Sequence, residues 1–289
     1  MAQVVVSGLL FGMVYALVAM GFSLVYRMTR VLNFAAGDLL MLGGFIGFSL
    51  YVQLRWPFIA VILTSSLAVG LLMVIVDRLA LAPAYRRSGV AATVSTIGLA
   101  FALQNGAQLF WGNLGLSFPT VFGNNPVPVF GVLIVPEMVA LFLIGSIGIV
   151  ILTLFMTRSR LGVAMRAVAG DPVMARLVGI NVERTKSLSF FIAGALGGIA
   201  GVLLAPITLL TTTMGTALGI KGFVAALIGG LGNLPGAVVG GLLLGLLETL
   251  VGAYLDPSWT DGIVFAIVVV LLLLRPFGIF GEEGIEEGR

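Results

Sequence analysis

Few residues of this chain can do chemistry. The sequence has 289 residues and contains neither histidine nor cysteine. Imidazole bases, thiolate nucleophiles, disulfides and the commonest metal ligands are therefore excluded, and we expect no metal site. The remaining candidates are ionisable side chains inside apolar stretches, because a charge in hydrocarbon is costly unless it is paired. Three stand out, namely Asp38, Lys221 and Glu248.

Lys221 and Glu248 are expected to form an intramembrane ion pair. The stretch "NLPG" at 233–236 is a turn signal between two apolar segments. Lys221 lies 13 residues before Leu234 and Glu248 lies 13 residues after Pro235, so an antiparallel hairpin places both at equal depth. A paired charge escapes much of its desolvation cost, which predicts a structural role.

Asp38 follows "NFAAG" near the inner end of an apolar segment. One interpretation makes it part of a translocation path or gate, and the other makes it an internal cap or packing site. Uncharged hydrogen-bonding side chains elsewhere could line a path for a zwitterion, although threonine also bonds its own helix backbone. The path candidates are Asn33, Gly37, Asp38, Gln104, Asn105, Gln108, Thr211 and Thr212.

The elements that must position these residues are membrane-spanning helices. The chain is 60% hydrophobic and only 9% charged, whereas soluble domains are about a quarter charged. Repeated apolar runs of the length that a bilayer demands predict an all-α polytopic membrane protein with eight or nine transmembrane or re-entrant helices. The short, Gly-rich segment 217–233 is either a short span or a re-entrant segment. We place spans at 3–25, 33–52, 58–77, 90–111, 137–157, 188–208, 217–233, 236–254 and 262–275.

Glycine pairs four residues apart predict close helix packing, because small residues at this spacing let backbones approach in lipid. The pairs are Gly8/Gly12, Gly43/Gly47, Gly194/Gly198, Gly197/Gly201, Gly236/Gly240 and Gly241/Gly245.

The distribution of Lys and Arg predicts the orientation. With the N-terminus outside, all basic residues except Arg55 and Lys221 fall on the cytoplasmic side, and so does the C-terminus. Trp56, Trp111 and Trp259 then lie at the outer interface, which indole rings favour. No basic stretch precedes the first apolar run, so we expect this span to be retained. The long connector 112–136 lies outside, as a docking surface or a structured link.

A charged segment at 158–187 interrupts the apolar pattern. Within it, "DPVMARLVG" reads as a two-turn helix with Asp171 as N-cap, Pro172 at the first position and Gly179 just past the end. Its apolar residues share one face, which predicts either a helix lying on lipid headgroups or a helix that docks into a cytoplasmic partner. The docking residues are Asp171, Pro172, Val173, Met174, Ala175, Leu177, Val178 and Gly179.

This segment and its continuation "SFFIAGALGGIAGVLLAP" resemble the permease subunits of branched-chain amino acid ABC importers. The stretches "VLNFAAGDLLMLGGF" (31–45) and "GGLGNLPGAVVGGLLLGLLE" (229–248) do so as well, and the likeness runs along nearly the whole chain. It implies one transmembrane permease domain, 1–289, with a cytoplasmic coupling loop. Of the general E-A-A-x-x-x-G coupling pattern only Ala175 and Gly179 match. Ala36 replaces a frequent family histidine, whose role cannot be carried over.

The resemblance also implies partners. Neither Lys186 nor Lys221 lies in a G-K-[ST] phosphate loop, so we expect no ATPase site and no cofactor in this chain. ATP and Mg²⁺ would bind two ATP-binding subunits, beside a second permease subunit in a heterodimer and a periplasmic binding protein. The expected location is the bacterial inner membrane, and no nucleic acid is involved.

Three alternatives remain open on the sequence. An ion-coupled secondary transporter would use Asp38 as its intramembrane carboxylate. An ABC permease for urea or amides would look similar. An intramembrane enzyme would need a Ser–Lys or Asp–Asp pair on facing helices, and Asp38 has no evident second aspartate at depth.

Overall fold

The computed structural model describes residues 1–85, 87–123, 125–129, 132–255 and 257–281. Eight helices in these ranges are long and apolar enough to cross a membrane. They are α1 (Ala2–Thr29), α2 (Ala36–Phe48) with its π-helical continuation η1 (Ser49–Gln53), α3 (Phe58–Val76) continued by η2 (Asp77–Leu81) and α4 (Ala82–Tyr85), α5 (Gly89–Trp111), α6 (Pro136–Arg158), α9 (Val182–Leu204), α11 (Leu234–Tyr254), and α12 (Thr260–Leu274) preceded by the 3₁₀ turn η3 (Pro257–Trp259).

The shorter elements lie between these spans. Helix α10 (Met214–Gly229) has 16 residues, about 24 Å of helix, which is less than a full hydrocarbon core. It overlaps the predicted segment 217–233. Helices α7 (Arg160–Gly170) and α8 (Pro172–Leu177) form the charged segment. In the connector 112–136, strands β1 (Val127–Val129) and β2 (Val132–Ile134) pair antiparallel, with Val127 opposite Ile134; residues 124, 130 and 131 lie outside the described residues.

Several predicted boundaries were wrong by three or more residues: α1 ends at Thr29 rather than 25, α9 at Leu204 rather than 208, and α10 spans Met214–Gly229 rather than 217–233. Helix α9 begins at Val182 rather than 188, because the Asn181 side chain accepts a hydrogen bond from the Arg184 amide and caps a polar first turn. Helix α2 begins at Ala36 rather than 33, since the Asn33 side-chain oxygen accepts from the Ala35 amide and holds a turn there. Hydropathy identifies the residues that lie in the hydrocarbon core of the membrane. A helix can extend beyond that core or begin inside it, so hydropathy does not fix the helix ends.

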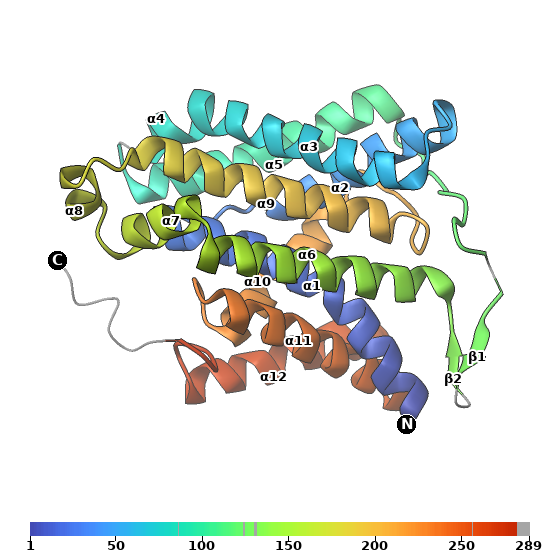
Figure 1. Cartoon of the computed structure of the whole chain (residues 1–289). Coiled ribbons are helices and arrows are strands. Elements are labelled where there is room, and N and C mark those ends of the chain that lie inside the picture. Colours follow the sequence, from blue (N-terminus) through green and yellow to red (C-terminus); the bar gives the residue numbers. More distant parts are fainter. Residues whose placement is uncertain (86, 124, 130–131, 256, 282–289) are drawn as a thin grey trace.

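Helix α1 runs through the centre of the bundle, where it packs on α9, α10 and α11, while α9 also packs on α2 and α3 (Figure 1). Small residues make these contacts close. A Cβ at Gly12 would lie 2.8 Å from the Leu242 Cα, and one at Gly43 would lie 2.6 Å from the Gly198 Cα. The packing predicted from the glycine spacing is confirmed at these positions.

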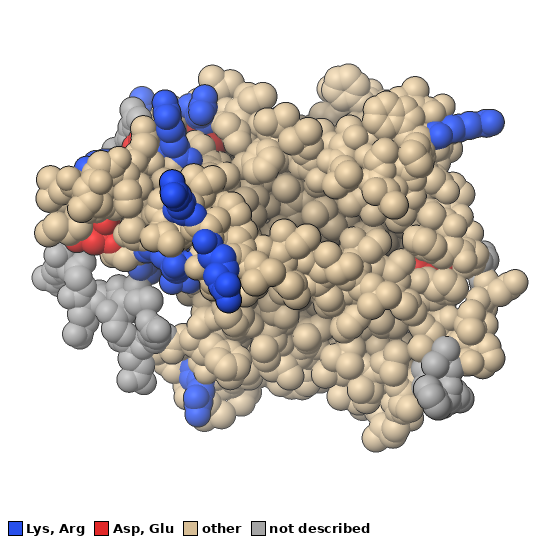
Figure 2. Space-filling view, in the orientation of Figure 1, with Lys and Arg blue, Asp and Glu red and all other residues tan. Residues whose placement is uncertain are grey.

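Lys and Arg gather at one end of the molecule, around α7 and α8, and the middle of the visible face carries almost none (Figure 2). We call this the basic end. Helices α1 and α6 finish there with Arg27 and Arg158 in their last turns. Two other basic residues of the predicted cytoplasmic set, Arg86 and Arg289, lie outside the described residues.

Candidate translocation and coupling sites

The short helix α8 is built as its sequence predicts. The Asp171 carboxylate accepts hydrogen bonds from the amides of Val173, at 2.8 Å, and Met174, at 3.0 Å. Pro172 occupies the first turn. Gly179 follows with φ of 83°, a left-handed conformation that favours glycine. The Ile180 amide then bonds back to the Ala175 carbonyl and closes the end.

Helix α8 turns its apolar side chains outward. Ala175 is 3% exposed and packs into the core, whereas Val173, Met174, Leu177 and Val178 are 60–75% exposed. The helix projects from the basic end of the bundle (Figure 1). An exposed Arg176–Glu183 ion pair of 3.5 Å links it to the first turn of α9. The face predicted to dock is therefore present and capped, and the described residues leave it uncovered.

A buried carboxylate that was not predicted from the sequence lies at the start of η2, beside the first turns of α9. Asp77, 2% exposed, accepts a 2.6 Å hydrogen bond from the Ser187 hydroxyl and another from the Tyr85 hydroxyl. The Lys186 ammonium lies 5.6 Å from the Tyr85 ring. We call Asp77, Tyr85 and Ser187 the latch, because they tie the start of α9 to the end of α3. The lone Asp77 in an apolar stretch was the signal that could have revealed it.

Asp38 lies where three helices meet. One of its carboxylate oxygens accepts a 2.9 Å hydrogen bond from the Gln104 amide, whose nitrogen also lies 2.8 Å from the Thr216 hydroxyl. The carboxyl group is deeply buried, with Asp38 1% exposed. Gly37 permits this approach of α2 to α10, because a Cβ there would lie 2.5 Å from the Gly219 Cα. Gly37, Asp38 and Gln104 are thus brought together.

The other predicted path residues make no hydrogen bond to this cluster within the described residues. The buried Asn33 holds the turn before α2, and its side-chain NH₂ has no partner among the described residues. Asn105 and Gln108 are exposed on α5, and the Asn105 amide donates to the Phe101 carbonyl at 2.7 Å. Thr211 and Thr212 belong to the non-helical segment before α10, where Thr212 is buried.

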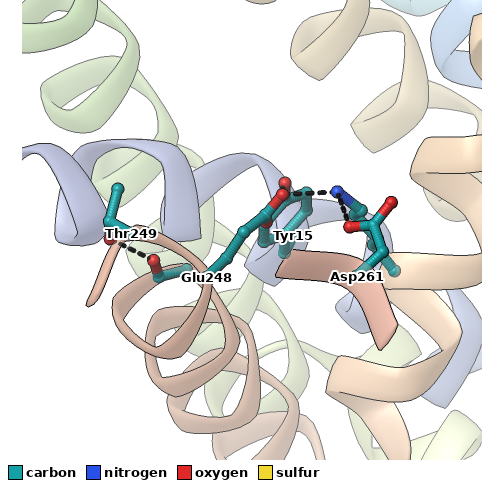
Figure 3. Close-up of polar contacts among 6 residues, drawn as sticks. Tyr15, Glu248, Thr249 and Asp261 are labelled. Carbon is teal, nitrogen blue, oxygen red and sulfur yellow. Dashed lines mark hydrogen bonds and ion pairs between the residues drawn. The ribbon is translucent and has the colours of Figure 1, made fainter. Parts of the chain in front are cut away.

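The predicted ion pair between Lys221 and Glu248 is confirmed, and it belongs to a larger cluster (Figure 3). Asp261, in the first turn of α12, lies 3.0 Å from the same ammonium. The Tyr15 hydroxyl of α1 donates to the second Glu248 oxygen at 2.5 Å. One cation therefore serves two carboxylates and joins α1, α10, α11 and α12. Asp261 and Tyr15 were missed, since neither is near the pair in sequence.

Comparison with known proteins gives a consistent result. Residues 4–273 match the family model described as "Branched-chain amino acid transport system / permease component". The chain is 33% identical to the high-affinity branched-chain amino acid transport system permease protein LivH of Escherichia coli K12, over 99% of this chain and 97% of the relative. It is also 33% identical to the corresponding permease protein BraD of Pseudomonas aeruginosa, over the same shares of each.

The likeness extends to an archaeal relative. The chain is 29% identical to the probable branched-chain amino acid transport permease protein LivH of Methanocaldococcus jannaschii, over 96% of this chain and 91% of that protein. The helical bundle, its eight long apolar helices and these matches agree. This multi-pass membrane protein belongs to the family of branched-chain amino acid transport system permease components.

Proposed function

We propose that this chain is the transmembrane permease domain, 1–289, of an ATP-driven importer that moves branched-chain amino acids across a bacterial inner membrane. A periplasmic binding protein delivers the substrate, and the N-terminus lies outside. The names of the curated relatives support the substrate class and the permease role. The basic end supports this orientation, since loops rich in Lys and Arg stay in the cytoplasm.

The observation that carries the proposal is the capped, outward-facing helix α8. Its side chains Val173, Met174, Leu177 and Val178 present an apolar face at the basic end, outside the membrane-spanning bundle. A helix this short is not stable alone, so its caps and the buried Ala175 hold it in place. A rigid apolar knob fits a cleft on a protein partner. Binding to a lipid surface would not require such a capped helix, because lipid would accept a looser apolar segment equally well.

ATP hydrolysis is assigned to that partner. The sequence has no G-K-[ST] phosphate loop, so two ATP-binding subunits would supply the energy and dock against α8. Movement of α8 would reach the bundle through α9, whose first turn follows it directly and whose Ser187 binds Asp77 of η2. The permease would alternate between inward-open and outward-open states.

The proposed path runs past the cluster of Asp38, Gln104 and Thr216. These groups offer one carboxylate, an amide and a hydroxyl within a largely apolar bundle. The discontinuous helices α2 and α10 begin here, each after a non-helical stretch, which is an arrangement found around transport paths. Asn33, Gly37, Asn105, Gln108, Thr211 and Thr212 would contribute to its walls and turns.

Reconstituted vesicles test the proposal. They contain this chain, its second permease subunit and the ATP-binding subunits, with binding protein outside and radiolabelled leucine as substrate. We expect uptake that requires ATP inside, and competition by isoleucine and valine but not by urea or acetamide. Uptake driven by an ion gradient without ATP-binding subunits would show a secondary transporter. Competition by urea or acetamide alone would overturn the substrate class.

A further inference from the structure

The last turn of α10 ends inside the protein. Ile228 is 1% exposed, and Gly229 and Gly230 are also buried. This end lies close to the basic end, since a Cβ at Gly232 would lie 3.7 Å from the Arg27 Cβ, and it is the inner end in the proposed orientation. The last carbonyl groups of a helix have no partner within that helix, so a buried helix end needs donors from elsewhere in the fold.

The segment that follows α12 supplies these donors. The Ile279 amide donates to the Ile228 carbonyl at 2.8 Å, and the Phe280 amide donates to the Gly229 carbonyl at 3.3 Å. The end of α10 is therefore satisfied by a segment that lies some fifty residues further along the chain. We call Arg275–Gly281 the strap.

Glycine lets the strap lie directly on the backbone that follows α10. A Cβ at Gly230 would lie 2.6 Å from the Gly281 nitrogen, and one at Gly278 would lie 2.4 Å from the Leu227 oxygen. Both glycines also adopt positive φ, 98° at Gly230 and 78° at Gly278, a conformation that side chains disfavour. The contact is therefore built for close approach on both sides.

Asn233 joins the strap to α11. Its Oδ1 accepts a 2.9 Å hydrogen bond from the Gly236 amide and caps the start of α11, while its Nδ2 donates to the Phe280 carbonyl at 2.9 Å. The Asn233 backbone amide donates to the Gly230 carbonyl at 3.0 Å. One residue thus links the end of α10, the start of α11 and the strap that continues α12.

Helix α10 is tied to α11 and α12 at a second level, and the three helices pack together (Figure 1). Lys221 lies eight residues before the end of α10, about 12 Å along the axis, and pairs with Glu248 of α11 and Asp261 of α12. Toward α5, by contrast, the hydrogen bond between Gln104 and Thr216 is the one that the described residues provide. Helix α10 is therefore held more firmly to α11 and α12 than to α5.

We propose that the strap anchors the inner end of α10 during transport, and that Asn233 is the residue that positions the strap. Anchored in this way, α10 moves together with α11 and α12. The movement that opens the path then occurs between α10 and α5, where Gln104 contacts Thr216. This inference rests on the proposed function, which makes α10 a wall of the path, and adds which end of α10 stays fixed and what fixes it.

Asn233→Asp tests the anchor, because it keeps an oxygen to cap α11 and removes the amide donor to the Phe280 carbonyl. Hydrogen exchange of the whole transporter reports on the strap, and reconstituted vesicles report leucine uptake and ATP hydrolysis. We expect several-fold faster exchange at Ile279 and Phe280. We also expect a several-fold fall in leucine transported per ATP, with the ATPase rate retained.

Asn181→Asp is the matched control. Asn181 caps α9 through the same side-chain oxygen, and its side-chain NH₂ makes no hydrogen bond among the described residues. The same chemical change there should alter neither the exchange of the strap nor the uptake per ATP.

Truncation removes the strap by a second route. A chain that ends at Pro276 loses the amides of Ile279 and Phe280 but keeps the Arg275 amide, which donates to the Leu271 carbonyl and closes α12. A chain that ends at Gly281 keeps the whole strap. We expect the shorter chain to repeat the effect of Asn233→Asp, and the longer one to transport as the full chain does.

The two measurements separate the outcomes. Unchanged exchange in Asn233→Asp would overturn the positioning role, and faster exchange with full uptake per ATP would overturn the anchor. Uptake and ATPase rate falling in proportion would show a purely structural strap and would also overturn it. If the chain ending at Pro276 does not assemble, Asn233→Asp in the full chain decides. If the native vesicles show no ATP-driven uptake, the proposed function fails, while hydrogen exchange still shows whether Asn233 holds the strap.

Discussion

At the scale of single residues, the cluster around Lys221 shows how a largely apolar protein holds charges. The ammonium faces both Glu248 and Asp261, and the Tyr15 hydroxyl binds the remaining Glu248 oxygen (Figure 3). The side chains of Lys221 and Glu248 are 18% and 24% exposed, whereas that of Asp261 is 64% exposed. Lys221 is therefore the member whose loss leaves the most uncompensated charge.

This asymmetry predicts a ranking of variants. Lys221→Met should destabilise the protein by up to about 3 kcal/mol, because it leaves the half-buried Glu248 without a cation. Glu248→Gln should cost less, since Lys221 keeps Asp261. The double variant Lys221→Met/Glu248→Met should recover much of the loss, as no buried charge remains. Thermal unfolding of purified protein in detergent measures all three. Equal losses for the two single variants would contradict the assigned roles.

The sequence could predict the Lys221–Glu248 pair because both residues belong to one hairpin, whose turn fixes their relative depth. It could not predict Tyr15 or Asp261, which reach the cluster from α1 and α12. The same holds for Asp38 and Gln104, which were identified separately as polar residues at depth. Their hydrogen bond and the contribution of Thr216 depend on how three helices cross. Sequence spacing carries no information on that crossing.

At the scale of elements, local rules predicted most of what was found. The N-cap, the first-turn proline and the terminal glycine of α8 act within a few residues, so "DPVMARLVG" specifies its own helix. The long spans follow from hydropathy in the same way. Strands β1 and β2 escaped prediction, because three-residue strands have no recognisable period.

Gly179 provides a test of α8. Its amide donates to the Arg176 carbonyl, and its φ of 83° is closed to proline. Gly179→Pro should therefore disrupt the end of α8 and uncouple ATP hydrolysis from uptake, with a several-fold fall in leucine transported per ATP. Gly179→Asn is the matched control, because asparagine tolerates the left-handed region. Asp171→Ala should act in the same direction, by removing an N-cap worth about 1 kcal/mol. Full coupling in Gly179→Pro would refute the role of α8.

The latch predicts a further effect on coupling. Ser187→Ala leaves the buried Asp77 with one hydrogen-bond donor fewer, so the start of α9 should be held less firmly to η2. We expect faster hydrogen exchange at the start of α9 and a lower uptake-to-ATP ratio, with the ATPase rate itself retained. Ser95→Ala is the control, since among the described residues that hydroxyl donates only to the Ala91 carbonyl of its own helix. Unchanged hydrogen exchange in Ser187→Ala would show that the latch does not hold the start of α9 to η2.

At the scale of the whole molecule, two classes of residue distinguish the two ends of the bundle. Lys and Arg concentrate at the basic end, whereas Trp56, Trp111 and Trp259 occur at α2–α3, at the end of α5 and before α12, which are the opposite ends of their helices. The eight long helices and the short α10 between α9 and α11 each reverse the chain direction, so the proposed orientation assigns a side to every described loop. In the proposed orientation, the connector with Leu114 lies outside and α7 lies inside.

The last prediction follows from this arrangement. Leu114 is 84% exposed in the connector after α5, and Val163 is 51% exposed on α7 at the basic end. In intact cells, with the outer membrane permeable to the reagent, a maleimide that cannot cross the inner membrane should label Leu114→Cys. It should label Val163→Cys only after the inner membrane is opened. The native chain lacks cysteine and gives the background. The reverse labelling pattern would show that the protein has the opposite orientation. Helix α8 would then lie on the side of the membrane where no ATP-binding subunit could reach it.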